Sequence, residues 1–252
     1  MARPTMAQNI ERRIKELILD RALGPGDPLP TETELMELFA AGRVSVREAL
    51  KALQAMNVVE IRRGFGTFVG SLSLTPFAEG LAFRAVVRHG RGEPGLLELM
   101  KVREALETGL VGAVSAGIPT EDLAVLRSLV ATMEAEAARD GRVARATDRA
   151  FHLALYASLD NHLLSEVLDA FWAAMDRVRT STDDGHQDPV TTCRQHHEIV
   201  VAVEAGDGAL AASAMRAHFD GIRSRLERHP AGGGYGVTVT DRLPDACLPS
   251  AR

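Results

Sequence analysis

The sequence lacks several features that mark secreted, membrane-bound or metal-cluster proteins. It has only two cysteines in 252 residues, Cys193 and Cys247, and their spacing fits neither a cysteine metal motif nor a disulfide framework. No apolar run approaches the ~20 residues of a membrane span, and the first ten residues lack the apolar core of a signal peptide. We therefore expect a cytoplasmic protein with reduced cysteines and no membrane partner.

Positive charge is also scarce. The chain has a net charge of −5; residues 1–70 carry ten Lys+Arg against nine Asp+Glu, and the remainder is net −6. Bulk charge therefore gives no reason to expect a nucleic-acid partner, and any such contact would depend on local clustering in the first part. The charged and hydrophobic fractions, 25% and 46%, are those of an ordinary globular protein.

Residues 1–70 follow the pattern of a winged helix-turn-helix domain. An amphipathic helix is expected over residues 8–22, and a second one begins at the capping box of Thr31 and Glu34 and ends near Ala40. A third helix is expected over residues 44–56. Two β-rich runs within residues 57–70 flank a glycine-containing turn and predict a hairpin. Two helices across a tight turn, followed by a hairpin, are typical of DNA-binding domains.

The third helix can pack on its own domain and present arginines outward. Its apolar stripe is formed by Val46, Ala49, Leu50 and Leu53, and basic residues lie on a flank at i, i+4 and i+8: Arg43, Arg47 and Lys51. Arginine matches both guanine edges and phosphates, and helix-turn-helix proteins read bases from this end of the helix, where Ser45 also lies. Arg63 and Gly64 at the wing tip add charge and close backbone approach. Taken alone, three basic residues also fit a solvated helix face.

Beyond a linker at residues 71–75, residues 76–229 have helical periodicity almost throughout. This pattern predicts an all-α antiparallel bundle, so that the whole chain is mainly α. The final residues, 230–252, are rich in glycine and proline, and we expect them to be disordered. Seven helical segments are expected, at about 76–89, 95–116, 120–138, 143–158, 160–182, 189–204 and 207–228.

Four polar side chains fall on the apolar stripes of three of these segments. Asp148 and His152 lie one turn apart in the stretch DRAFHLALY, while His196 and His218 lie on the stripes of the last two segments. Buried carboxylate and imidazole groups need partners. One aspartate and three histidines form a ligand set that suits a divalent metal, Zn most of all, and also Ni, Mn or Fe. The alternative is a set of hydrogen-bonded core histidines.

Two further charged residues, Arg103 and Glu107, share an inward-facing stripe. A buried guanidinium requires an anion, which is either Glu107 or the carboxylate of a bound acid. Cys193 lies one turn before His196, where it either packs or reaches a metal, and we expect His197 to be exposed.

Both parts of the chain resemble a known family. The stretches GPGDPLPTETEL, GRVSVREALKALQ and RRGFGTFV resemble the N-terminal domain of GntR regulators. VREALETGL, TDRAFHLALYASLDNHLL and HHEIVVAVEAGDGALAASAMRAH resemble the FCD effector domain of the FadR subfamily, over residues 76–228. The resemblance implies a ligand-responsive transcription regulator, most often a repressor, that binds a palindromic double-stranded DNA operator as a homodimer.

The resemblance also implies roles for single residues. In the first domain Arg43, Arg47 and Gly64 take the main DNA-contact positions, with Ser45 and Arg63 beside them. Two departures from the family pattern are expected to change the operator sequence or to weaken DNA binding. Thr33 stands where many members have an arginine, and Gly42 replaces the usual serine or threonine.

In the second domain, the resemblance implies that Asp148, His152, His196 and His218 hold a divalent metal at the floor of an effector pocket. Because all four are present, an acyl-CoA effector is disfavoured and a small organic acid is expected. Arg103 and Asn161 are candidate contacts to that acid, Asn161 because it matches the family's S-G-N position.

Three alternatives stay open: a regulator with a structural or signalling metal, a regulator with a non-metal effector, and a metallohydrolase carrying a DNA-binding head. A hydrolase needs a general base beside a metal-bound water. The sequence indicates no inward-facing glutamate near the four donors, and we therefore expect no enzymatic activity.

Overall fold

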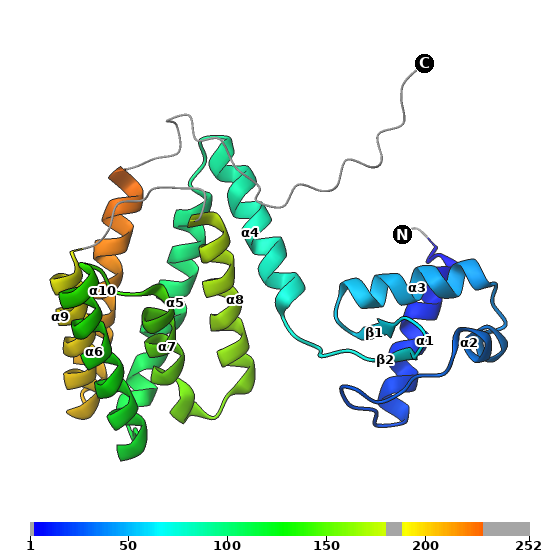
Figure 1. Ribbon diagram of the computed structural model, residues 1–252, viewed down its shortest axis with the longest axis horizontal. Helices are drawn as coiled ribbons and strands as arrows, with labels where there is room; N and C mark the ends of the chain where they lie inside the picture. The colour runs from blue at the N-terminus through cyan, green and yellow to red at the C-terminus, as the bar shows by residue number, and fades with distance from the viewer. Residues whose placement is uncertain (1–2, 180–187, 229–252) are drawn as a thin grey trace. The chain divides into compact units, whose positions relative to one another are not determined.

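The computed structural model describes residues 3–179 and 188–228, and it confirms the mainly helical architecture. The chain divides into two compact units, Met1–Ala78 and Glu79–Arg252 (Figure 1). The expected disorder of residues 230–252 concerns a segment outside the described residues, as does Cys247. Within the described residues, no helix is both long and apolar enough to span a membrane.

The first unit is a three-helix domain with a β-hairpin. Its helices are α1 (Met6–Asp20), α2 (Glu32–Phe39) and α3 (Arg43–Ala55), and its strands β1 (Val59–Arg62) and β2 (Gly66–Val69) pair antiparallel. The capping box predicted at Thr31 and Glu34 is present at the start of α2. Ala40, in the left-handed conformation, ends α2 and allows the tight turn into α3. One face of each helix contributes to a single core, which includes Ile14, Leu35 and Leu50.

The second unit is a helical bundle whose elements match the seven predicted segments closely. They are α4 (Thr75–Gly90), whose first four residues still belong to the first unit, α5 (Gly95–Ser115), α6 (Thr120–Asp140), α7 (Arg145–Leu155), α8 (His162–Arg179), α9 (Pro189–Glu204) and α10 (Gly208–Arg228). The segment expected at 143–158 is shorter than predicted. Helix α7 ends at Leu155, and a 3₁₀ turn, η1 (Ala157–Leu159), leads to Asp160 in the left-handed conformation.

Helix packing in the bundle brings the candidate residues into one interior. Helix α10 packs against α5 and α9, α6 packs against α7 and α9, and α8 packs against α5 and α7 (Figure 1). Two glycines allow α5 and α10 to approach closely, because a Cβ atom on Gly208 would lie 3.1 Å from the Cα atom of Gly112. Side chains from α5, α7, α8, α9 and α10 therefore share one core.

Candidate metal centre and DNA-reading surface

Asp148 and His152 of α7, His196 of α9 and His218 of α10 meet inside the bundle. One potential ligand atom from each lies within 4.8 Å of the others. The three histidines are fully or almost fully buried, whereas the Asp148 side chain is 26% exposed. The cluster therefore reaches solvent on the Asp148 side. The structure brings together the four residues that the sequence singled out as metal donors.

Hydrogen bonds orient two of the imidazoles toward the cluster. The Nδ1–H group of His196 donates to the backbone carbonyl of Thr192 at 2.8 Å, which leaves Nε2 facing Asp148 Oδ1 at 2.9 Å. His152 Nδ1 lies 2.5 Å from a Glu107 carboxylate oxygen, so that its Nε2 atom also points inward. An imidazole lone pair and a carboxylate oxygen at such distances repel each other unless a proton or a cation lies with them.

Unpartnered buried atoms test whether this cluster fits a metal. The described residues contain eight buried side-chain nitrogen or oxygen atoms without a hydrogen-bond partner, and five belong to His152, His218, Arg103 and Trp172. Each such atom costs about 1–3 kcal/mol. Five of them would consume much of the ~5–15 kcal/mol that stabilises a typical domain. The donor set therefore fits a divalent cation, which would take up Nε2 of His152 and one ring nitrogen of His218.

The electrostatics of the cluster also favour a cation. Burial alone would raise the pKa of Asp148, but the neighbouring imidazoles of His152 and His196 outweigh it and hold that pKa well below its usual range. Burial and the neighbouring imidazoles lower the pKa of His218, which is therefore neutral and keeps a free lone pair. Burial opposes protonation of His152, yet the carboxylates of Glu107 and Asp148 raise its pKa. A metal bound at Nε2 of His152 would displace the proton from that nitrogen.

Arg103 lies beside this cluster with part of its guanidinium unused. The guanidinium carbon lies 3.8 Å from the centre of the Trp172 ring and 5.2 Å from that of Phe219. Nε donates to Glu107, Nη1 approaches the sulfur of Met175 at 3.9 Å, and Nη2 has no hydrogen-bond partner in the part of the chain that the structure describes. Of the two anions considered for Arg103, the structure shows Glu107, which pairs with its Nε.

The contact between Glu107 and His152 was not predicted from the sequence. The Glu107 carboxylate lies directly behind His152, so the expectation that no inward-facing glutamate lies near the donors was wrong. Periodicity placed Glu107 on the inner face of α5 but could not reveal its neighbour on α7, 45 residues away in the chain. Both carboxylate oxygens are occupied by Arg103 and His152, and no hydrolytic role follows from this position.

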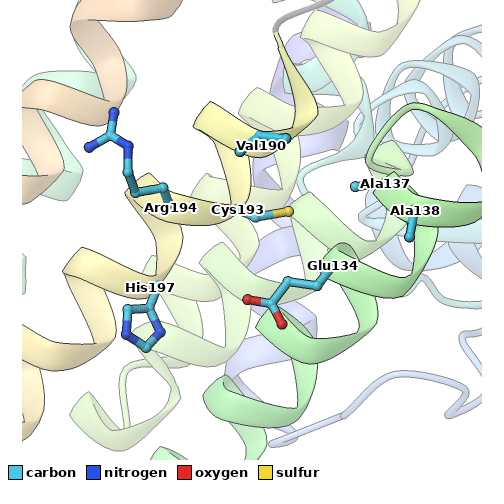
Figure 2. Close-up of a pocket in the computed structure, with 7 residues that line it drawn as sticks. All are labelled: Glu134, Ala137, Ala138, Val190, Cys193, Arg194 and His197. Atoms are coloured by element: carbon cyan, nitrogen blue, oxygen red, sulfur yellow. The ribbon is translucent and has the colours of Figure 1, made fainter.

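Other candidate residues lie apart from the cluster. Asn161 is exposed, and its side-chain oxygen accepts a hydrogen bond from the backbone N–H of Leu164 at the start of α8, so nothing in the structure assigns it to an effector. Cys193 is buried, and its sulfur points from α9 toward α6 into a surface pocket of about 500 Å³ (Figure 2). His197 is exposed, as expected, and lines the same pocket.

In the first unit, the predicted DNA-contact residues gather at the start of α3 and at the tip of the hairpin. Arg43 and Arg47 are exposed, and Ser45 is partly exposed between them. Arg47 Nε pairs with Glu32 of α2 at 2.8 Å. Gly42 occupies the N-cap of α3 without a side-chain cap. Its departure from the family pattern therefore removes a cap, at a cost of a few tenths of a kcal/mol.

The hairpin tip is equally exposed. Arg63 and Gly64 lie between β1 and β2, and Gly64 has a φ of 81°, a conformation that side-chain-bearing residues rarely adopt. Phe65 beside them is 83% exposed. The tip thus combines a positive side chain with a backbone that can approach a phosphate closely.

Comparisons with known proteins match each of the two units to a protein family. Residues 6–69 match the model of bacterial regulatory proteins of the gntR family, and residues 98–221 match the FCD domain. The HTH-type transcriptional regulator LutR of Bacillus subtilis is 31% identical, with 83% of this chain and 96% of LutR covered. The HTH-type transcriptional repressor NanR of Edwardsiella tarda is 26% identical, with coverage of 88% and 85%. A solved structure, Streptococcus agalactiae GntR, aligns with a TM-score of 0.63 at 25% identity and covers 86% of this chain and 99% of its own.

The single tryptophan of the chain provides an intrinsic probe of the donor cluster. The Trp172 ring lies 5.6 Å from that of His152, and Ni²⁺ is among the ions that suit such donors. We expect one equivalent of Ni²⁺ to quench Trp172 fluorescence, and chelator to restore it. The matched control is the double variant Asp148→Ala/His196→Ala, which should show no saturable quenching. Equal quenching of both proteins would contradict the ligand assignment.

Proposed function

This chain is a transcription regulator of the GntR family with an FCD domain, and on that basis we propose that a divalent metal and a small organic acid bound inside its bundle control its hold on DNA. The metal ligands in this proposal are Asp148, His152, His196 and His218. The relatives named above are regulators of transcription, and the chain is not an enzyme.

The unpartnered buried atoms carry the ligand half of the proposal. His152 and His218 present unused imidazole nitrogens, and Arg103 presents an unused guanidinium nitrogen in the same apolar interior. A metal alone would leave the Arg103 nitrogen without a partner. A purely structural metal thus accounts for fewer of these atoms than a metal together with an acid.

Different residues of the bundle would contact different parts of such an acid. The bound metal would supply open coordination positions for oxygen atoms. Arg103 would hold the carboxylate through its terminal nitrogens, with the face of its guanidinium packed on Trp172. Phe151 and Phe219 contact the donor imidazoles edge-on and keep water from them. Sugar acids, hydroxy acids and dicarboxylates all have the required chemistry.

The exposed arginines support the DNA half of the proposal. Arg43 and Arg47 would read base edges in the major groove, with Ser45 beside them, while Arg63 and Gly64 of the wing would contact the backbone. A homodimer would present two such surfaces to the half-sites of a palindromic operator.

Ligand binding and DNA binding would be linked through the helices that carry the donors. The acid contacts α5, while the metal ligands lie on α7, α9 and α10, so that filling the site changes how these helices pack. An effector shifts the balance between two states only by its differential affinity for them, and ~1–3 kcal/mol is typical. One of the relatives, NanR, is a transcriptional repressor. By analogy, we propose that the acid releases this chain from its operator.

Thermal melting tests the ligand half. We expect one acid from a panel of sugar acids, hydroxy acids and dicarboxylates to raise the melting temperature of the metal-loaded protein by several degrees. A ligand at 100 times its Kd adds ~2.7 kcal/mol. Chelator should abolish the shift, as should Asp148→Ala/His196→Ala. An acid that stabilises the chelated protein as much as the metal-loaded protein would indicate a site that needs no metal. If chelator left the melting temperature unchanged, the four candidate ligands would be hydrogen-bonded core residues and not a metal site.

Substitution of Arg47 tests the DNA half. Arg47→Ala should weaken binding to a duplex selected from random sequences by the wild-type protein roughly five- to 150-fold, because a bidentate guanine contact contributes ~1–3 kcal/mol. Fluorescence anisotropy at fixed salt measures this change. Arg12→Ala, which removes a similarly exposed arginine of α1, should bind normally. Unchanged binding by the Arg47 variant would exclude α3 as the reading helix.

A further inference from the structure

The Glu107 carboxylate joins the two halves of the candidate ligand site. It is fully buried on α5, and each of its oxygens has one partner. One accepts from Nε of Arg103 at 2.5 Å, and the other lies 2.5 Å from Nδ1 of His152 on α7. Its backbone carbonyl accepts from the Tyr156 hydroxyl at 2.8 Å, which anchors this turn of α5 to the end of α7.

The contact with His152 determines which ring nitrogen can serve as a ligand. Because Nδ1 faces Glu107, only Nε2 points into the cluster, where it has no hydrogen-bond partner among residues 3–179 and 188–228. A carboxylate behind a ligating histidine fixes the ring and makes the ligating nitrogen more basic. His196 has a neutral backbone carbonyl in the corresponding place. Of these two imidazoles, only His152 is supported by a charged group.

The contact with Arg103 determines which of its nitrogens face a ligand. Glu107 occupies Nε, so the terminal pair remains, and within the described residues Nη2 has no partner. The Trp172 ring stacked on the guanidinium prevents it from rotating freely. The same carboxylate thus selects the end of Arg103 that can form a fork with an anion.

We propose that Glu107 is a positioning residue that couples the two binding groups: it holds His152 with Nε2 free for the metal and Arg103 with its terminal nitrogens free for the acid. This proposal rests on the metal and acid site described above. It predicts that losing the negative charge of Glu107 weakens metal binding although Glu107 never touches the metal. Loss of such a supporting carboxylate typically costs 10–100-fold in metal affinity.

Zn²⁺ alone is the probe for the test, with the full chain and a competing chromophoric chelator to report the Kd. We expect Glu107→Gln to weaken Zn²⁺ binding at least tenfold. Glu104→Gln is the matched control, because Glu104 lies one turn earlier on α5 and its carboxylate pairs with Arg223 instead of a histidine. The control should bind Zn²⁺ like the wild type even where it lowers stability.

A spectroscopic readout separates positioning from general destabilisation. In the Zn²⁺-loaded wild type, the Nδ1 proton of His152 should give a low-field NMR resonance because of its short hydrogen bond to a carboxylate. Glu107→Gln should shift that resonance upfield, and Glu104→Gln should leave it in place.

The paired variant Arg103→Met/Glu107→Gln keeps the test decisive if the single variant fails to fold, because it removes both buried charges together. It too should bind Zn²⁺ at least tenfold more weakly than the wild type. Wild-type affinity in either Glu107 variant would overturn the coupling role and leave the proposed function standing. Failure of the wild type itself to bind Zn²⁺ would instead overturn the proposed function.

Discussion

The cost of burying charged and polar groups inside an apolar bundle is the constraint on which this structure depends. Helices α5, α7, α9 and α10 could have packed with aliphatic side chains alone, yet they enclose three imidazoles, a guanidinium and a carboxylate. Such groups are tolerated only where they satisfy one another or a ligand. The chain of contacts from Arg103 through Glu107 to His152 satisfies part of them, and the remainder points to a bound cation and anion.

The two units place their charged residues differently: the first exposes them to solvent, and the second buries several of them. The first keeps a conventional apolar core and places its arginines in solvent, where a polyanion can reach them. The second encloses polar and charged groups, and low dielectric there would strengthen their interaction with the ligands proposed above. A regulator needs both arrangements, because operator binding requires a broad accessible surface and effector selection requires an enclosed one.

Much of this arrangement follows from the sequence. Inward-facing polar residues could be identified because each interrupts an apolar stripe of helical period: Asp148, His152, His196 and His218. The ends of most helices could be predicted because glycine or proline marks them. Two points were beyond such reasoning. Helical period shows which face Glu107 occupies but not that His152 lies opposite. Asn161 was assigned from a motif position alone, whereas the fold uses its side chain to cap α8.

Anomalous X-ray diffraction from crystals of the protein loaded with Zn²⁺, collected at the zinc edge, tests the central claim most directly. The account predicts one strong peak per chain within about 2.0–2.2 Å of a donor atom from each of Asp148, His152, His196 and His218. It also predicts that Nε2 of His152, and not Nδ1, faces the peak. A peak bound elsewhere, such as at the exposed His197, or none at all, would contradict it.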